Sequence, residues 1–419
     1  NADELGSGIS YIKKESGQEL RSKMRQKLMR ISVLLALIIQ SNSSIFFTSA
    51  QAFESFNFQG NGFGHGVGLS QIGAKAMALD GKSAEDILKY YFTGVIVEPV
   101  ADWYDVRVNI GHQLKSAKIQ LVSNTGYLLI NDFKISDQKT IATFNYTNSG
   151  ISTSIKKGKK LIATLPPTNQ IQINWSGTRF LEGDTSVISF SNGKATRYQF
   201  GQINLTVVGK SFEVTNNVRI KDEYLYGISE VSSSWPMQSL RAQAIAARTY
   251  AISKAGIYRP SCDCDLYGTI KDQLFVGITK ISEPKFGQFW KAAVDSTSVD
   301  EENGEAITYL GNPINAYYSS SSGGQTESSL DAFGTAFDYL VSVQDPASLD
   351  PKLNPKFANW EREVSHLAVA KAFGLTDVEK LEINGKRIEA TSKNGAKTSL
   401  RLETFRSRTA LPGSTFKIL

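Results

Sequence analysis

The chain has 419 residues, with 46 basic and 40 acidic side chains and a formal net charge of +6. This length allows two compact domains. Residues 1–52 hold seven of the basic and four of the acidic residues, so they contribute +3 and leave the remainder only mildly basic. The weak net charge and the lack of a Lys/Arg cluster with interleaved aromatics argue against a nucleic-acid-binding surface. It suits an anionic cell wall or plain solubility equally well.

The first 52 residues follow the order of a secretory signal. Arg21 to Arg30 is basic, Ile31 to Ile39 is apolar, and Ala50-Gln51-Ala52 offers a small-x-small cleavage site. An apolar run of this length is short for a bilayer span, which needs about 20 residues. We therefore expect an upstream extension and signal peptide over 1–52. A membrane anchor that stays uncut is the alternative.

The residues after the signal predict two segments of different pattern. Over 53–100, a glycine-rich opening leads into helices, and Ser83 to Asp86 resembles a capping box. Over 101–218, alternating runs such as Val106 to Ile110 are separated by turn residues at short intervals, which is typical of antiparallel strands.

The segment 219–419 mixes helices and strands. Pro236 to Lys254 is predicted to be a helix that begins at its proline, and Glu361 to Phe373 is predicted to be another. Ala306 to Tyr318 is predicted to form a hairpin, and Val378 to Leu419 to return to strands. The fold class expected is α+β, with an antiparallel β-rich core, a few packed helices and a β-rich subdomain.

Glu230 is the leading candidate for chemistry. It precedes a short loop and an alanine-rich helix, and Tyr224, Tyr226 and Trp235 could shield it. Apolar surroundings raise the pKa of a carboxyl, which suits a general acid at a glycosidic oxygen. A solvated glutamate, or a partner of the helix dipole, is the simpler alternative. No second carboxylate lies at short spacing, so a two-carboxylate hydrolase has no local support.

Two further stretches carry polar groups among glycines. The stretch Gly62 to Gln71 holds His65 between glycines that permit positive φ and close backbone approach. His65 could be an acid/base, a sugar hydrogen-bonding group or a metal ligand, or it could be held structurally by loop carbonyls. Gly323 to Glu327 offers hydroxyl-binding groups and a possible second acid, or is simply a polar hairpin end.

Cys262 and Cys264 are separated by one residue. Free or locally bridged thiols are favoured over a metal site, because zinc normally has four ligands and no histidine is near in sequence. No cofactor is expected.

Several of these motifs together resemble the stage II sporulation protein D family, which includes the amidase enhancers of bacterial cell walls. The residues that carry the resemblance are Tyr224-Leu225-x-Gly227 to Glu230, Ser234-Trp235-Pro236, Leu240 to Tyr250, Gln273-x-Phe275-x-Gly277, Tyr317 to Thr326, Tyr339-Leu340, and Gly64-His65-Gly66-Val67-Gly68-x-Ser70-Gln71-x-Gly73-Ala74.

The order and two motifs depart from the family. The Gly-His-Gly loop usually lies at the C-terminus there, whereas here it precedes the strands, as in a circular permutation. We expect Gly62 to Gly94 to dock onto a catalytic core over 219–419. Val231-Ser232 replaces a common Met-Pro after the acid, and Cys262 and Cys264 stand where some members bind zinc with a histidine.

The resemblance implies a lytic transglycosylase that acts on peptidoglycan glycan through Glu230 as the only acid/base. It also suggests side chains that orient Glu230 or line the groove: Arg248, Arg241, His65, Ser70, Gln71, Gln325, Thr326 and Trp235. The expected partners are peptidoglycan strands, with a cell-wall amidase as a further candidate, no nucleic acid, and membrane contact only through the signal segment. The location implied is secreted or cell-wall associated.

Two other functions stay open. A non-catalytic amidase enhancer would bind glycan and stimulate a partner hydrolase. A metal hydrolase would use Cys262, Cys264 and His65.

Overall fold

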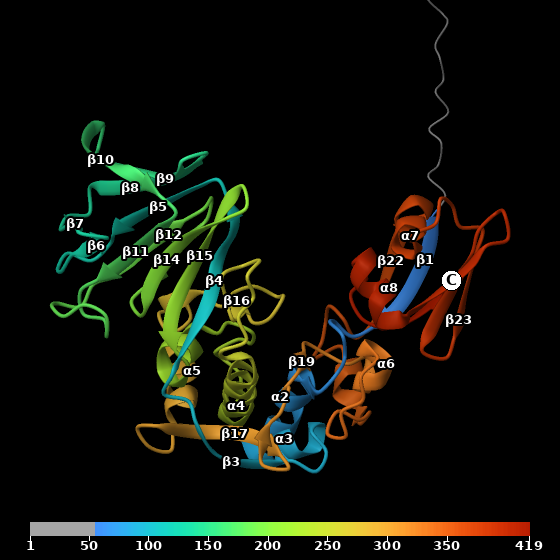
Figure 1. Cartoon of the computed structure of the whole chain (residues 1–419). Coiled ribbons are helices and arrows are strands. Elements are labelled where there is room, and N and C mark those ends of the chain that lie inside the picture. Colours follow the sequence, from blue (N-terminus) through green and yellow to red (C-terminus); the bar gives the residue numbers. More distant parts are fainter. Residues whose placement is uncertain (1–54) are drawn as a thin grey trace, which may run out of the picture. The chain divides into compact units, whose positions relative to one another are not determined.

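The computed structural model describes residues 55–419 (Figure 1). The signal peptide and cleavage site predicted over residues 1–52 lie outside the described residues. Within the part that is described, no helix is long and apolar enough to cross a membrane.

Two large sheets are interleaved along residues 105–219, and one further strand at residues 266–267 joins the second of them. The six-stranded sheet has the order β10-β9-β8-β5-β12-β13. Its strands are β5 (Ser116–Leu121), β8 (Thr140–Thr147), β9 (Gly150–Lys157), β10 (Lys160–Thr168), β12 (Ile188–Ser191) and β13 (Ala195–Tyr198). The seven-stranded sheet has the order β16-β4-β15-β14-β11-β6-β7. Its strands are β4 (Asp105–Leu114), β6 (Leu128–Ile130), β7 (Phe133–Ile135), β11 (Gln170–Trp175), β14 (Gln202–Val208), β15 (Ser211–Arg219) and β16 (Leu266–Tyr267).

The period-2 alternation of these strands creates one shared core. Ile119 and Phe144 of the six-stranded sheet and Ile173 and Val214 of the seven-stranded sheet are buried in a single hydrophobic cluster. The same cluster includes Leu240 of α4 (Met237–Lys254), so the long helix contributes to this core. Each sheet can bury one face in this way and leave the other to water.

The remaining elements are helices and small sheets. The α-helices are α2 (Gln71–Leu79), α3 (Ala84–Tyr91), α4 (Met237–Lys254), α5 (Gly287–Asp295), α6 (Ser329–Phe333), α7 (His366–Phe373) and α8 (Leu402–Thr409). Short 3₁₀ or π turns are η1 (Ile220–Tyr224), η2 (Leu225–Gly227), η3 (Gly277–Thr279) and η4 (Pro346–Leu349). The small sheets contain β2 (Leu69–Ser70), β3 (Ile96–Ala101), β17 (Asn303–Tyr309), β18 (Asn312–Pro313), β19 (Tyr318–Ser319), β20 (Gly324–Gln325), β21 (Gln344–Asp345), β23 (Lys380–Asn384), β24 (Arg387–Thr391) and β25 (Lys397–Arg401).

A three-stranded sheet joins the two ends of the described chain. β1 (Ser55–Asn61) lies between β22 (Trp360–Ser365) and β26 (Thr415–Ile418), antiparallel to both. In Figure 1 the blue β1 runs among the red C-terminal elements. The backbone N–H of Leu419 donates to the carbonyl of Asn57 at 2.9 Å.

The α+β class predicted from sequence is confirmed. The helix predicted from Pro236 is α4, with Pro236 at its N-cap, and the capping box at Ser83 is present at the start of α3. The internal boundaries at about residues 100 and 218 stay predictions.

Three sequence predictions were wrong in part. The helix predicted from Glu361 begins only at His366, because residues 360–365 pair with β1 and the Ser365 side chain caps the helix. The C-terminal strand region contains the helix α8. The predicted hairpin is confined to β17 and β18, since Tyr318 pairs instead with Leu69.

Candidate functional site

Glu230 is held by a short antiparallel pairing between residues 227–230 and 274–276. Ile228 and Phe275 form a β-bridge, and the backbone N–H of Ser229 donates to the carbonyl of Leu274 at 2.8 Å. The N–H of Leu274 then donates to Oε1 of Glu230 at 2.6 Å. The carboxyl is therefore fixed by backbone on a segment 44 residues away.

A chain of side-chain hydrogen bonds ends at Glu230. The Tyr224 hydroxyl donates to Oε1 of Gln273 at 2.7 Å, and Nε2 of Gln273 donates to the Tyr318 hydroxyl at 2.9 Å. The Tyr318 hydroxyl is bonded to the Glu230 carboxyl. Because Tyr318 already accepts from an amide N–H, its own proton is free to point at the carboxyl, so the whole chain donates in one direction.

Burial raises the pKa of Glu230 above its ordinary value, while the hydrogen bonds from Leu274 and Tyr318 act in the opposite direction. The residue is half-buried, so desolvation penalises its charged form without closing it from a ligand. A carboxyl with a raised pKa that still accepts hydrogen bonds can both give and take back a proton.

The loop after Glu230 is anchored by side chains of residues 280–283. The carbonyl of Val231 accepts from the ammonium of the buried Lys280 at 2.6 Å, and the hydroxyl of Ser233 donates to Oε2 of Glu283 at 2.6 Å. Thus Val231 and Ser232 belong to a loop whose backbone is held in place.

The Gly-His-Gly loop packs against the segment that carries Tyr318. β2 pairs in parallel with β19, so that Leu69 lies opposite Tyr318 and Ser70 opposite Ser319. Gly68 has φ +73°, and a Cβ there would overlap the carbonyl oxygen of Tyr317. This glycine is thus required for the close approach of the two strands.

His65 is a positioning residue in this arrangement. Its Nδ1 accepts from the backbone N–H of Val67 at 3.0 Å, and its ring is bonded to the backbone of Tyr318. Burial, helped by the positive charge of Arg406, lowers the pKa of His65 from 6.5 to about 4. A neutral imidazole with these bonds holds the loop against β19 and has no proton to give near neutral pH.

Ser70 and Gln71 face the interior. The Ser70 hydroxyl caps α2 by accepting from the N–H of Gly73 at 3.2 Å, and Nε2 of Gln71 donates to Oε1 of Gln243 on α4 at 3.1 Å. Both side chains are buried, so they tie the loop to the core here rather than line an open groove.

The two arginines of α4 make contacts within the protein. Arg248 is 0% exposed and pairs with the equally buried Asp102 at 2.8 Å. Arg241 lies 3.3 Å from Oε2 of Glu305 and is partly exposed. Of the two arginines, only Arg241 has a side chain that is exposed enough to contact a ligand.

The other predicted ligand-binding residues lie at different depths. Gln325 is exposed and bonds the Ser342 hydroxyl, whereas Thr326 is buried and accepts from the N–H of Val343 at 2.8 Å. Trp235 is half-buried, with the Lys75 ammonium 5.3 Å from its ring centroid. Glu327, considered as a second acid, is buried against Lys386 at 2.7 Å.

Cys262 and Cys264 form a disulfide, as the favoured interpretation allowed. Both sulfurs are therefore oxidised and cannot ligate zinc as thiolates. Within residues 55–419, no group of three or more His, Cys, Asp or Glu side chains is arranged to hold a metal ion.

Sequence reasoning missed Tyr318 and Gln273 as partners of Glu230. Gln273 stood in a short motif of its own, and Tyr318 directly precedes the serine run, but neither spacing points to Glu230. Their proximity depends on pairing between segments that are 44 and 88 residues from Glu230 in the chain.

Comparison with known proteins identifies similar sequences. A family model described as Stage II sporulation protein matches residues 208–309. An uncharacterized protein of Brachyspira hyodysenteriae is 28% identical over 206 residues, which is 49% of this chain and 52% of that protein. The amidase enhancer of Bacillus subtilis is 31% identical over 126 residues, 30% of this chain and 15% of that protein. The stage II sporulation protein D of the same organism is 64% identical over 33 residues, 8% of this chain and 10% of that protein.

The chain thus spans about half the length of the Brachyspira protein, 52%, and much less of the two Bacillus proteins. No solved structure is significantly similar. The matched residues 208–309 include Glu230, Gln273 and Lys280, whereas His65 and Tyr318 lie outside them.

Proposed function

We propose, on the premise that this chain belongs to the stage II sporulation protein D and amidase enhancer family, that it is a lytic transglycosylase acting on cell-wall glycan. The observation that carries the proposal is the half-buried Glu230 carboxyl, whose pKa is raised by burial and which is fixed by the Leu274 N–H and the Tyr318 hydroxyl.

The chemistry needs one acid. Protonated Glu230 gives its proton to the glycosidic oxygen as the C1–O bond breaks, and the departing glycan leaves with a free hydroxyl. The Glu230 carboxylate then takes the proton of the sugar's own 6-hydroxyl while that oxygen bonds to C1. The product is a 1,6-anhydro sugar, Glu230 ends protonated, and no water is consumed, which suits a site without a second carboxylate close in sequence.

Tyr318 supports the charged half of this cycle. Its hydroxyl donates toward the carboxyl, and the donation is fixed by Gln273, which itself receives from Tyr224. A hydrogen bond to the charged form stabilises the carboxylate after it has lost its proton. The raised pKa shows that burial outweighs this bond in the free protein, so the acid begins the cycle protonated more often than an exposed glutamate.

The proposed substrate and location follow from the family. Relatives named amidase enhancer and stage II sporulation protein D suggest a cell-wall role, and we place the protein outside the cytoplasm with peptidoglycan strands as its substrate. A wall amidase is a possible partner in the same compartment.

The test is digestion of purified sacculi, with mass spectrometry of the released fragments. Wild type should release 1,6-anhydro products, and Glu230→Gln should slow their release by at least about 100-fold, the low end of general acid catalysis. Glu382→Gln is a matched control, because this glutamate lies on β23, away from the hydrogen-bond chain of Glu230. Anhydro products at the wild-type rate from Glu230→Gln would refute the assignment.

One observation favours a second function. The Bacillus subtilis relative matched over 126 residues is named an amidase enhancer. If this chain is a non-catalytic enhancer, it will bind sacculi without releasing products and will raise the rate of an added wall amidase. Glu230→Gln would then leave that stimulation unchanged.

A further inference from the structure

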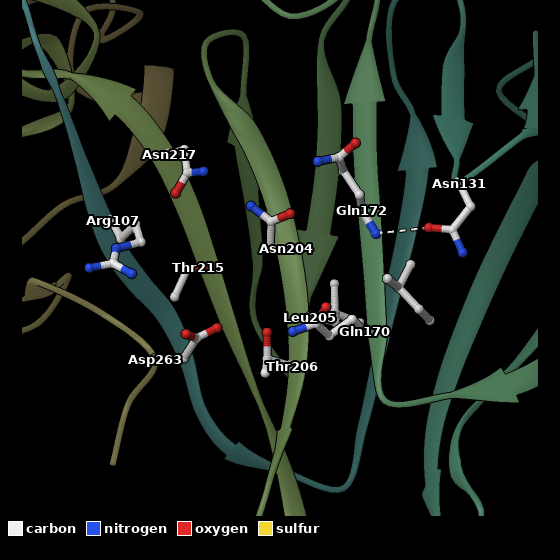
Figure 2. A pocket seen from close by; sticks show the side chains of 11 residues that line it. Arg107, Asn131, Gln170, Gln172, Asn204, Leu205, Thr206, Thr215, Asn217 and Asp263 are labelled. Atoms are coloured by element: carbon white, nitrogen blue, oxygen red, sulfur yellow. Dashed lines mark hydrogen bonds between the residues drawn. The ribbon is translucent and has the colours of Figure 1, made fainter. Parts of the chain in front are cut away.

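The seven-stranded sheet carries a polar hollow of about 420 Å³ on the face opposite its core. Figure 2 shows side chains of adjacent strands standing on this one face. Residues of the opposite alternation, such as Ile173, Ile203 and Val214, are buried in the core. The hollow is therefore built by the same period-2 pattern that builds the sheet.

Amide side chains dominate this surface. Gln172 lies opposite Asn204, which in turn lies opposite Thr215, so one row crosses three strands. Beside this row, the backbone N–H of Gln172 donates to the side-chain Oδ1 of Asn131 at 2.9 Å (Figure 2). Amides and hydroxyls provide donors and acceptors without charge.

The charged groups at the hollow are already paired. Arg107 donates to Oδ1 of Asp265 at 2.7 Å, and Asp263 accepts from the Tyr258 hydroxyl at 3.0 Å. Tyr258 is 47% exposed, and its ring centroid lies 4.5 Å from the Arg107 guanidinium. The rim thus presents an exposed aromatic ring beside one cationic and two anionic side chains, Arg107, Asp265 and Asp263, and this excess of negative charge does not favour a polyanion.

One acceptor at the hollow is left without a partner. Oδ1 of Asn217 is buried and makes no hydrogen bond in the structure, although Asn217 lines the hollow opposite Arg107. A buried polar atom without a partner costs free energy.

A second hollow of about 480 Å³ adjoins the first and shares Asn131 with it. Its lining is more apolar, and includes Phe133, Leu165 and the Pro166-Pro167 pair. An apolar hollow beside an amide-rich one suits a ligand that carries both methyl groups and hydroxyls. Both volumes lie in the range of ordinary small-ligand sites.

We propose that these two hollows form a binding site for neutral, N-acetylated glycan that is separate from Glu230. Sugar hydroxyls and acetamido groups meet the amides of β11, β14 and β15, and acetamido methyls meet the proline pair. The inference goes beyond the proposed function, because this site anchors glycan and takes no part in bond cleavage.

The disulfide fixes one end of the site. The carbonyl of Cys262 accepts from Nδ2 of Asn109 on β4 at 2.9 Å, and the N–H of Asp265 donates to the carbonyl of Arg107 at 2.9 Å. These bonds hold the loop that carries Asp263 beside the sheet. The bridge between Cys262 and Cys264 limits the conformations of that loop, so we expect reduction to weaken glycan binding.

The probe is the tetramer of N-acetylglucosamine, titrated calorimetrically into the wild-type chain and into Gln172→Ala/Asn204→Ala. Both side chains project from the sheet surface, so we expect the double variant to fold and to bind at least about tenfold more weakly, as the loss of one or two hydrogen bonds implies. The matched control is Asn145→Ala/Asn192→Ala, which removes two exposed amides from other positions and should bind as wild type does. Maltotetraose, which lacks acetamido groups, should bind more weakly than the tetramer.

Three outcomes would overturn the proposal: no binding of the tetramer to wild type, equal affinities for wild type and the Gln172/Asn204 variant, or equal affinities for the tetramer and maltotetraose. Each titration is repeated with Glu230→Gln added to both chains, which prevents cleavage of the probe, so the result does not depend on whether Glu230 is catalytic. Failure of the glycan site and failure of the transglycosylase proposal are thereby distinguished.

Discussion

Acidification is expected to destabilise this protein through His65. The imidazole is half-buried, accepts from Val67 through Nδ1 and lies near the positive Arg406, so desolvation and that charge lower its pKa from 6.5 to about 4. The unfolded chain binds a proton there more readily than the folded chain does. The stability contributed by neutral His65 is thus complete above about pH 6.5 and is lost as the pH falls from there toward 4.

The expected loss follows from the two pKa values. Between about pH 7.5 and about pH 4.5, a histidine with a folded pKa near 4 and an unfolded pKa of 6.5 removes about 2.5 kcal/mol from the free energy of unfolding. Partial exposure of the ring makes this an upper value. Protonation also replaces the acceptor of the Val67 N–H by a second N–H, which loosens the loop from β19.

The assay is urea unfolding of wild type and His65→Asn at both pH values. The asparagine Oδ1 can accept from the Val67 N–H and does not titrate, so the variant should lose less stability on acidification, by up to about 2.5 kcal/mol. Equal losses for wild type and His65→Asn would show that His65 does not carry the acid sensitivity.

Three more perturbations test the same contacts. Tyr318→Phe removes the hydroxyl that donates to Glu230, so the upper pH limit of glycan cleavage should move to higher pH, at a stability cost of about 1 kcal/mol; an unshifted pH–rate profile would contradict this. Arg248→Met leaves buried Asp102 unpaired and should cost about 3–5 kcal/mol in urea unfolding, with part of the loss recovered when Asp102→Asn is added. Gly68→Ala places a Cβ at φ +73° against the carbonyl oxygen of Tyr317. It should lower the free energy of unfolding by more than about 2 kcal/mol and reduce the rate of glycan cleavage as well. Wild-type values for both would contradict the close packing of the loop.

Local signals predicted the elements whose stability is mostly local. α4 begins where Pro236 predicts, and α3 begins with the capping box at Ser83. β22 was missed because Glu361 to Ser365 become a strand only by pairing with β1, about 300 residues earlier in the chain. Tertiary pairing overrides local propensity in such segments.

The candidate site divides in the same way. Glu230 could be selected from its position before α4 and from the family motif, but the groups that set its pKa are distant in sequence. Tyr318 reaches it only because β19 lies against β2, and Leu274 only because residues 274–276 pair beside it. Conversely, the resemblance suggested Arg248 as a residue that orients Glu230 or lines the groove, yet its side chain forms a buried ion pair with Asp102 that the sequence does not reveal.

The position of the Gly-His-Gly loop near the start of the chain has a structural consequence. The loop reaches Tyr318 from β1, which is held on both edges by β22 and β26. The Leu419 N–H donates to the carbonyl of Asn57, so the end of β26 lies beside the beginning of β1. A chain that continued from β26 could therefore enter β1 and the loop directly. Moving the loop from one terminus to the other therefore requires no change in where it packs, only a cut and a join between neighbouring strands. The position of the loop thus depends on its contact with β19, while the sheet of β22, β1 and β26 holds β1, and with it His65, in place.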